Sequence, residues 1–469
     1  MKNLLSCTAA LLGIALTLSG CAKATFNYEP EPEEEPKIPT PEISVKQPET
    51  YPANSGTYSV DYTIADAREG VKLEASSEDG WITGVTADDK TVTFSLTENT
   101  STEERSGSIS LAYQDAKTIK LNIRQAGKQA LTALDASGTA NCYIVSAAGT
   151  YKFAAVKGNS TESVGEAAKA EVLWETFGTA TAPQKGELIS EVTIENDAVV
   201  FKTPDEYKEG NALIAVKDAS DNILWSWHIW LTDKPEDQVY KFNAGTMMDR
   251  NLGATSATPG EHGTLGLYYE WGRKDPFMGR VKPAEEEYAK STLDPWPDKV
   301  YCNEEIGTIE YATAHPTTFI ESGGKGPLDW IFIKNNDLWK SEKTMYDPCP
   351  PGYRIPDGGP NGIWAKAFGG DCEMGFVGKG YDEIHHGYDF GAKSQNTFSD
   401  SPTCWYPIAG VELDGDGYNH QKSFYWSCDY EFALNSYWYS YVFEISESYI
   451  YPIDSYPRNT LASVRCRKE

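Results

Sequence analysis

The segment Thr91-Val92-Thr93-Phe94-Ser95-Leu96 alternates polar and apolar residues along its whole length. Because successive side chains of a β-strand point to opposite faces of a sheet, this alternation predicts a strand with one buried face. The same period of two recurs in Val60-Asp61-Tyr62-Thr63-Ile64 and from Ile119 to Ile123, with turns rich in Gly, Asp and Asn in between. We therefore expect residues 43–127 to form an immunoglobulin-like β-sandwich.

Short motifs inside this segment resemble the BACON domain, a family named for suspected carbohydrate binding in Bacteroidetes proteins. The resemblance implies a binding module without a catalytic residue, and a plain spacer module is the alternative. Trp81 begins a strand, and we expect it in the core because Trp is usually highly buried. The motifs are Trp81-Ile82, Thr91-Val92-Thr93-Phe94, Glu98-Asn99, Arg105-Ser106-Gly107 and Arg124-Gln125-Ala126-Gly127.

Residues 131–238 are also β-patterned and are expected to form a second β-rich domain. The run from Ile223 to Trp230 is apolar on both faces apart from Ser226 and His228, which predicts a central strand. Asp218-Ala219-Ser220-Asp221-Asn222 before it predicts a hairpin turn. His228 could bind a ligand, but a single histidine makes no site, so we expect a core histidine.

Five motifs follow one another through residues 241–469. In this order they resemble the Fibrobacter succinogenes major paralogous domain, in a Bacteroides-type version with an insertion around 280–345. That family's fold looks like a relative of C-type lectins and formylglycine-generating enzymes, so the resemblance implies a loop-rich α+β domain without an established reaction. The motifs are Met248-Asp249-Arg250-Asn251-Leu252-Gly253, Gly266-Leu267-Tyr268-Tyr269-Glu270-Trp271-Gly272, Cys349-Pro350-Pro351-Gly352-Tyr353-Arg354-Ile355-Pro356, Tyr425-Trp426-Ser427 and Ser463-Val464-Arg465-Cys466.

The N-terminal residues have the features of an export signal. Lys2 precedes a short apolar stretch, and Leu18-Ser19-Gly20-Cys21 then places small residues before a cysteine. Residues 1–20 resemble a bacterial lipoprotein signal peptide, which implies removal of the peptide and a lipid on Cys21. An ordinary secretory signal or a buried helix is the alternative.

Residues 21–42 are acidic and rich in proline, as in Glu29-Pro30-Glu31-Pro32, and predict an extended, self-repelling spacer. Acidic residues near the lipid cysteine also resemble the surface-export signals of Bacteroidetes lipoproteins. We therefore expect an outer-membrane protein anchored by its N-terminal lipid and exposed at the cell surface. The expected fold class is mainly β and multidomain.

The charge of the chain excludes one class of partner. Lys and Arg number 41 against 69 Asp and Glu, which gives a formal net charge of -28. Nucleic-acid binding depends mainly on cations that neutralise phosphates, so we expect no nucleic-acid partner. The sequence also lacks the phosphate-binding loop, the nucleophile elbow and the paired-histidine zinc motif, so we expect no enzyme.

The cysteines predict two disulfides. Cys349 and Cys466 both lie in motifs of the C-terminal resemblance, and a bond between them would close a loop of more than a hundred residues. Cys404 and Cys428 are a second candidate pair, because a hairpin centred on residue 416 places them opposite each other. The pairing of Cys302 and Cys372 is left open.

The same hairpin predicts a ligand surface. Its strands, Cys404 to Val411 and His420 to Cys428, have an apolar face for the core. The opposite face would carry Trp405 and Tyr425, joined by Trp438 from the next strand, and exposed rings suit the apolar faces of sugars. The alternative is that another part of the chain covers these rings, because large exposed aromatic clusters are uncommon.

Asp414 and Asp416 lie in the turn of this hairpin and are weak candidates for binding calcium, but an ordinary turn explains them better. We expect no cofactor. The sequence thus predicts a non-enzymatic surface lipoprotein that binds a glycan or another surface ligand. Two alternatives stay open: a structural, fimbria-like component without its own ligand, and an enzyme of the formylglycine-generating type, which would need paired cysteines such as Cys428 and Cys466.

Overall fold

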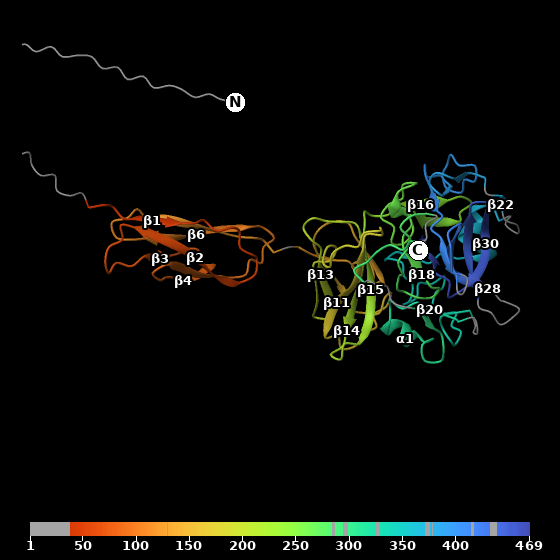
Figure 1. Ribbon diagram of the computed structural model, residues 1–469, viewed down its shortest axis with the longest axis horizontal. Coiled ribbons are helices and arrows are strands. Elements are labelled where there is room, and N and C mark those ends of the chain that lie inside the picture. Colours follow the sequence, from red (N-terminus) through yellow and green to blue (C-terminus); the bar gives the residue numbers. More distant parts are fainter. Residues whose placement is uncertain are drawn as a thin grey trace, which may run out of the picture. The chain divides into compact units, whose positions relative to one another are not determined.

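The computed structural model in Figure 1 is mainly β, as the sequence predicts. Two compact units divide the chain, Met1–Lys128 and Gln129–Glu469. The expected signal peptide and Cys21 lie outside the described residues. Within the described part of the chain, no helix is long and apolar enough to cross a membrane. The structure describes residues 38–128, 130–283, 287–293, 299–323, 328–370, 376–377, 379–413, 417–431 and 439–469.

The first unit contains two antiparallel sheets, drawn in red to orange in Figure 1. One sheet has the strand order β1-β2-β5-β4 and the other has the order β3-β6-β7. The alternating residues of the sequence supply the core: Val92, Phe94 and Leu121 are fully buried. The strands are β1 (Glu42–Val45), β2 (Gly56–Ala65), β3 (Glu74–Ser76), β4 (Ile82–Ala87), β5 (Thr91–Leu96), β6 (Arg105–Ala112) and β7 (Ile119–Gln125).

Trp81 lies at the margin of this core. Its side chain is partly buried and packs against the core cluster. The guanidinium carbon of Arg105 lies 4.4 Å from the Trp81 ring centroid. The ring is therefore held against the sheet by a cation–π contact in place of complete burial.

The second unit begins with a β-sandwich, labelled by β11, β13, β14 and β15 in Figure 1. Its two sheets have the orders β12-β13-β10-β8 and β11-β14-β15-β9. Both β8 and β9 pair in parallel with their neighbours, so the first residues of this unit supply one strand to each sheet. The strands are β8 (Leu131–Ala133), β9 (Cys142–Val145), β10 (Thr150–Ala154), β11 (Lys169–Thr176), β12 (Glu191–Glu195), β13 (Ala198–Lys202), β14 (Gly210–Lys217) and β15 (Ile223–Leu231).

Strand β15 is central, as its apolar residues on both faces predict, because it lies between β14 and β9. His228 on this strand is buried, and its Nε2 lies 2.8 Å from Oδ1 of Asn211. Burial lowers the pKa of His228 to about 3. It is therefore a neutral core histidine, as expected.

The remainder of the second unit is rich in loops around a six-stranded sheet with the order β18-β31-β28-β29-β30-β22. A second sheet has the order β16-β17-β32-β21. The helices are η1 (His262–Thr264), α1 (Ile309–Ala314), η2 (Gly359–Asn361) and α2 (Ile363–Ala367). The strands are β16 (Asp237–Tyr240), β17 (Gly245–Met248), β18 (Tyr268–Tyr269), β19 (Val300–Tyr301), β20 (Ile320–Glu321), β21 (Tyr353–Arg354), β22 (Phe376–Val377), β23 (Tyr381–Asp382), β24 (Gly387–Asp389), β25 (Trp405–Pro407), β26 (Val411–Leu413), β27 (Gly417–Asn419), β28 (Lys422–Glu431), β29 (Tyr439–Ser446), β30 (Tyr449–Pro457), β31 (Ala462–Ser463) and β32 (Arg467–Lys468).

Sequence motifs far apart in the chain meet in these sheets. The amide of Leu252 donates a hydrogen bond to the carbonyl of Val464 over 2.8 Å. Trp426 donates its indole N–H to the carbonyl of Tyr269 over 2.9 Å. Cys349 and Cys466 form the predicted disulfide, with Cα atoms 5.9 Å apart. The end of the chain, marked C in Figure 1, is thus fastened inside the second unit.

The predicted hairpin between residues 404 and 428 is wrong in its pairing. Gly410 has a φ of 84°, a left-handed conformation that ends the apolar run. The run therefore splits between β25, which pairs with β24, and β26, which pairs with β27. The short hairpin that remains pairs Val411 with Asn419 instead of Gln421. Strand β28 pairs with β29.

Candidate functional site

A polar groove of about 400 Å³ opens where a loop meets the end of β28. We call it the Tyr430 groove, after its most exposed ring: Tyr430 is 40% exposed. The loop contributes side chains that can donate and accept hydrogen bonds, and the strand contributes a thiol, a carboxylate and the tyrosine. Its lining residues are Asn336, Asp337, Trp339, Lys340, Ser341, Glu342, Cys428, Asp429 and Tyr430.

A β-bulge in β28 positions the three strand residues that line the groove, Cys428, Asp429 and Tyr430. Trp426 pairs with Val442 and Tyr430 pairs with Ser440, so the register shifts between these two pairs and β28 has extra residues there. The amide of Cys428 leaves the ladder and donates a hydrogen bond to the carbonyl of Pro356 over 2.9 Å. Such bulges redirect side chains at the edges of sheets.

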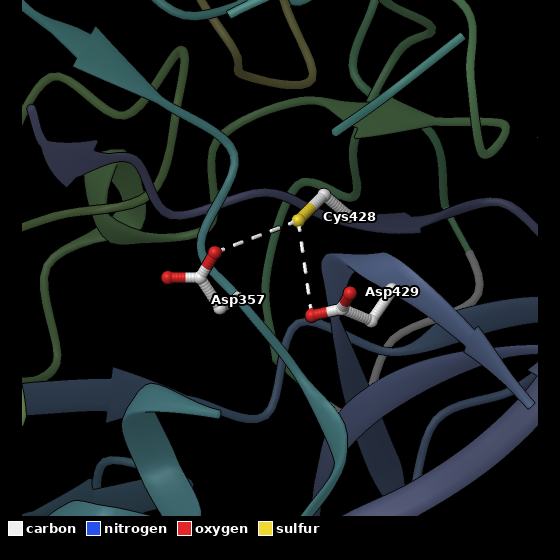
Figure 2. Close-up of side chains that lie close together, drawn as sticks. All are labelled: Asp357, Cys428 and Asp429. Atoms are coloured by element: carbon white, nitrogen blue, oxygen red, sulfur yellow. Dashed lines mark hydrogen bonds between the residues drawn. The ribbon is translucent and has the colours of Figure 1, made fainter. Parts of the chain in front are cut away.

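Figure 2 shows the thiol of Cys428 between two carboxyl groups. Its Sγ lies 3.9 Å from Oδ1 of Asp357 and 3.9 Å from Oδ2 of Asp429. Burial, and then the nearby charges of Asp429 and Asp357, raise the pKa of the Cys428 thiol. The thiol is therefore protonated and donates to the carboxylates, and it is not an activated nucleophile.

The two carboxyl groups differ in their surroundings. Burial opposes the ionisation of Asp357, but hydrogen bonds and the charge of Arg354 outweigh it and lower the pKa of that carboxyl. Arg354 contacts both Asp357 oxygens, at 3.0 and 2.8 Å, and Arg467 contacts Oδ2 as well. Burial raises the pKa of Asp429, whose Oδ2 accepts the amide of Gly358 over 2.8 Å.

The donor atoms of Asp357, Cys428 and Asp429 all lie within 4.8 Å of one another, close enough for a metal ion. Two guanidinium groups already pair with Asp357, however, Asp429 accepts the Gly358 amide, and the thiol is held in its neutral form. A cation would have to displace these hydrogen bonds, so the cluster is better explained as a polar wall that fixes the base of the groove.

The predicted bond between Cys404 and Cys428 is absent: both are free thiols. They were expected to face each other across a hairpin, but β25 and β28 do not pair there. Cys466 is bound to Cys349 and gives Cys428 no partner thiol. Cys302 and Cys142 are also free, and Cys372 lies outside the described residues.

The predicted aromatic surface is wrong for two of its three rings. Trp405 is 2% exposed and Tyr425 is fully buried. The backbone of Gly387 in β24 lies close against the Trp405 ring, and Tyr425 donates its hydroxyl to the carbonyl of Pro407 over 2.6 Å. Both rings are therefore packing residues, and Trp438 lies outside the described residues.

Asp414 and Asp416, the weak calcium candidates, lie outside the described residues as well. The Tyr430 groove itself was missed by the sequence analysis. Its loop and strand are about ninety positions apart in the sequence, and neither has a periodic pattern. The signal that the sequence offered was Tyr425-Trp426-Ser427, which lies directly before the groove residues of β28.

Residues 72–126 match the BACON family model, described as "Putative binding domain, N-terminal". This match lies within the first unit and confirms that part of the resemblance. No curated protein matches the chain.

Several solved structures match parts of the chain. The Bacteroides ovatus GH5 xyloglucanase in complex with a XXXG heptasaccharide is 15% identical with a TM-score of 0.16, and the match covers 18% of this chain. The chain spans only 19% of the length of that enzyme. The I67-I69 domains of titin are 12% identical over 43% of this chain and 68% of that chain, with a TM-score of 0.17. The endo-fucoidan hydrolase MfFcnA4 is 12% identical over 42% of this chain and 29% of that chain, with a TM-score of 0.17.

Proposed function

We propose that the protein is a non-enzymatic cell-surface lipoprotein that binds carbohydrate in the Tyr430 groove. The observation that carries this proposal is the composition of the groove. A half-exposed tyrosine ring lies beside carboxylate, amide, hydroxyl and ammonium groups in a hollow of about 400 Å³. The volume falls within the ~300–1,000 Å³ that is usual for ligand pockets.

The chemistry of these groups fits a sugar. The ring offers a flat apolar surface to the C–H face of a pyranose, as aromatic residues do in amphipathic sites. Asp337 and Asp429 can accept hydrogen bonds from sugar hydroxyls, and charge-assisted hydrogen bonds of this kind are the stronger ones. Lys340 is paired with Asp337 over 2.6 Å, so the described residues that line the groove do not include the cluster of free cations that an anionic ligand would need.

The first unit supports a role in binding, because its BACON match is described as a binding domain. The expected lipid on Cys21 and the acidic spacer would hold both units away from the outer membrane. Protease treatment of intact cells tests this placement: cleavage is expected at the surface, and full protection would place the protein inside the envelope.

The binding proposal is tested with the lipid-free chain from residue 22 on a glycan array, followed by calorimetry. We expect a neutral glycan to bind, and Tyr430→Ala to weaken its binding by about tenfold, or ~1.4 kcal/mol. Phe242→Ala is the matched control, because Phe242 is a 70% exposed ring outside the groove. Absence of glycan binding, or binding that Tyr430→Ala leaves unchanged, would overturn the proposal.

A further inference from the structure

We infer that the Tyr430 groove continues into a neighbouring hollow and that its ligand is a glycan chain of several units, in contrast to one terminal sugar. This inference rests on the proposed function. The neighbouring hollow has a volume of about 450 Å³, and its wall includes Thr308, Ile309, Phe332, Ile333 and Lys334. We call it the Ile333 hollow.

The two hollows lie next to each other. Asn335 lines the Ile333 hollow, and the next residue, Asn336, lines the Tyr430 groove. Lys334 lines the Ile333 hollow, and its Nζ lies 5.4 Å from the centroid of the Tyr430 ring. A ridge of two residues therefore separates them, and a ligand that crosses this ridge contacts both.

The ridge is fixed from below by Arg458, whose side chain is fully buried. Its Nη1 donates to the carbonyl of Asn335 over 3.3 Å, and its Nη2 donates to Oδ1 of Asn336 over 2.7 Å. The guanidinium carbon lies 3.8 Å from the Trp271 ring centroid. Because the ridge is held from the core, the two hollows keep their spacing without a ligand.

The Ile333 hollow differs from the Tyr430 groove in its chemistry. Ile333 is 78% exposed and Phe332 is 40% exposed, so two large apolar side chains face the solvent beside Glu304 and Glu310. Covering such side chains is favourable because it removes apolar surface from water. A sugar unit that follows the one on Tyr430 can place its apolar face here and its hydroxyls toward the carboxylates.

The test measures affinity against chain length. The probe is the neutral polysaccharide that binds most strongly on the array, supplied to the lipid-free chain as oligosaccharides from one unit to about six. We expect affinity to rise by about tenfold or more along the series, which corresponds to ~1.4 kcal/mol. Ile333→Ala is expected to reduce binding of the longest oligosaccharide severalfold and to leave the shortest one that binds unchanged.

Ile384→Ala is the control, because Ile384 is 83% exposed and lines neither hollow. Tyr430→Ala should weaken every length. Affinity that is independent of length, or an Ile333→Ala loss that is equal at all lengths, would overturn the inference and leave the proposed function standing. If no length binds at all, the proposed function itself fails.

Discussion

Glu444 shows how strongly burial perturbs single residues in the second unit. It lies in β29, is 1% exposed, and has Oε1 3.4 Å from Nζ of Lys422. Burial, and then a hydrogen bond shared with Asp454, raise the pKa of Glu444 from 4.5 to about 8. These effects outweigh the attraction of Lys422, so the folded protein favours the protonated acid.

This shift predicts a pH-dependent stability. Between pH 4.5 and about 8 the folded state binds the proton of Glu444 more tightly than the unfolded state does. The free energy of unfolding should therefore fall as the pH rises through this window, by up to about 1.4 kcal/mol per pH unit. Urea denaturation at a series of pH values measures this slope. We expect Glu444→Gln to make this slope less steep, because the amide does not ionise; Glu270 and Asp329, whose pKa values burial also raises, supply the rest.

Glu447→Gln is the control for this experiment, because Glu447 is an exposed glutamate that follows the same strand. In this control variant the free energy of unfolding should depend on pH as it does in the parent chain. A Glu444→Gln protein with an unchanged pH profile would show that this carboxyl does not titrate in the window.

At the scale of elements, the disulfide fastens two short strands. Cys349 precedes β21 and Cys466 precedes β32, and these strands pair through Arg354 and Arg467. Each strand has only two residues, too few to hold the pairing by hydrogen bonds alone. Because the bond closes a loop of 117 residues, its removal should cost about 4–5 kcal/mol in the chain-entropy model.

The measurement is urea denaturation with and without a reducing agent. We expect reduction to lower the free energy of unfolding by about that amount. A Cys349→Ser, Cys466→Ser double variant should be destabilised to the same extent and should not respond to the reducing agent. A parent chain that is equally stable in both conditions would contradict the predicted contribution.

The strands that could be predicted from sequence are those with one buried face or two. β5 follows from its alternation and β15 from its continuous apolar run, because both patterns report directly on local burial. The change of direction at Gly410, which separates β25 from β26, could not be predicted. An apolar run does not show whether a glycine within it adopts a left-handed conformation and ends the strand. The same change of direction explains why the prediction of an exposed face for Trp405 and Tyr425 is wrong: it assumed that their two strands pair in a single sheet. The Tyr430 groove depends on a bulge and on a distant loop, and neither has a sequence period.

At the scale of the whole molecule, the sandwich and the C-terminal part of the second unit share one core. Asn141 before β9 donates hydrogen bonds to the carbonyls of Met345 and Asp347, over 2.7 and 2.9 Å. Its Oδ1 accepts the indole N–H of Trp225 over 3.0 Å. Lys274 and Asp275, a buried ion pair at 2.7 Å, both bond to Ser226 of β15.

These contacts predict that residues 130–469 unfold in a single transition. Asn141→Ala would leave the Met345 carbonyl and the Trp225 indole without these partners, and each such group costs about 1–3 kcal/mol. The Asp347 carbonyl would keep its hydrogen bond from Asn159. We expect a loss of at least about 2 kcal/mol in urea denaturation, with tryptophan fluorescence and circular dichroism still giving coincident curves. Two separated transitions, with the loss confined to one, would show that the two parts fold independently. If the two parts fold independently, a fragment from residue 241 onward should fold by itself. If they share one core, the same fragment should aggregate.

The position of β32 in its sheet constrains how the protein can be made. This strand lies between β17 and β21, and Cys466 just before it closes the disulfide with a residue 117 positions earlier. During synthesis the chain emerges from its N-terminal side, so the edges of β17 and β21 that pair with β32 stay unpaired until these last residues are made. The second unit must therefore remain incomplete until nearly the whole chain has been made, and until then its unpaired strand edges are open to wrong pairing.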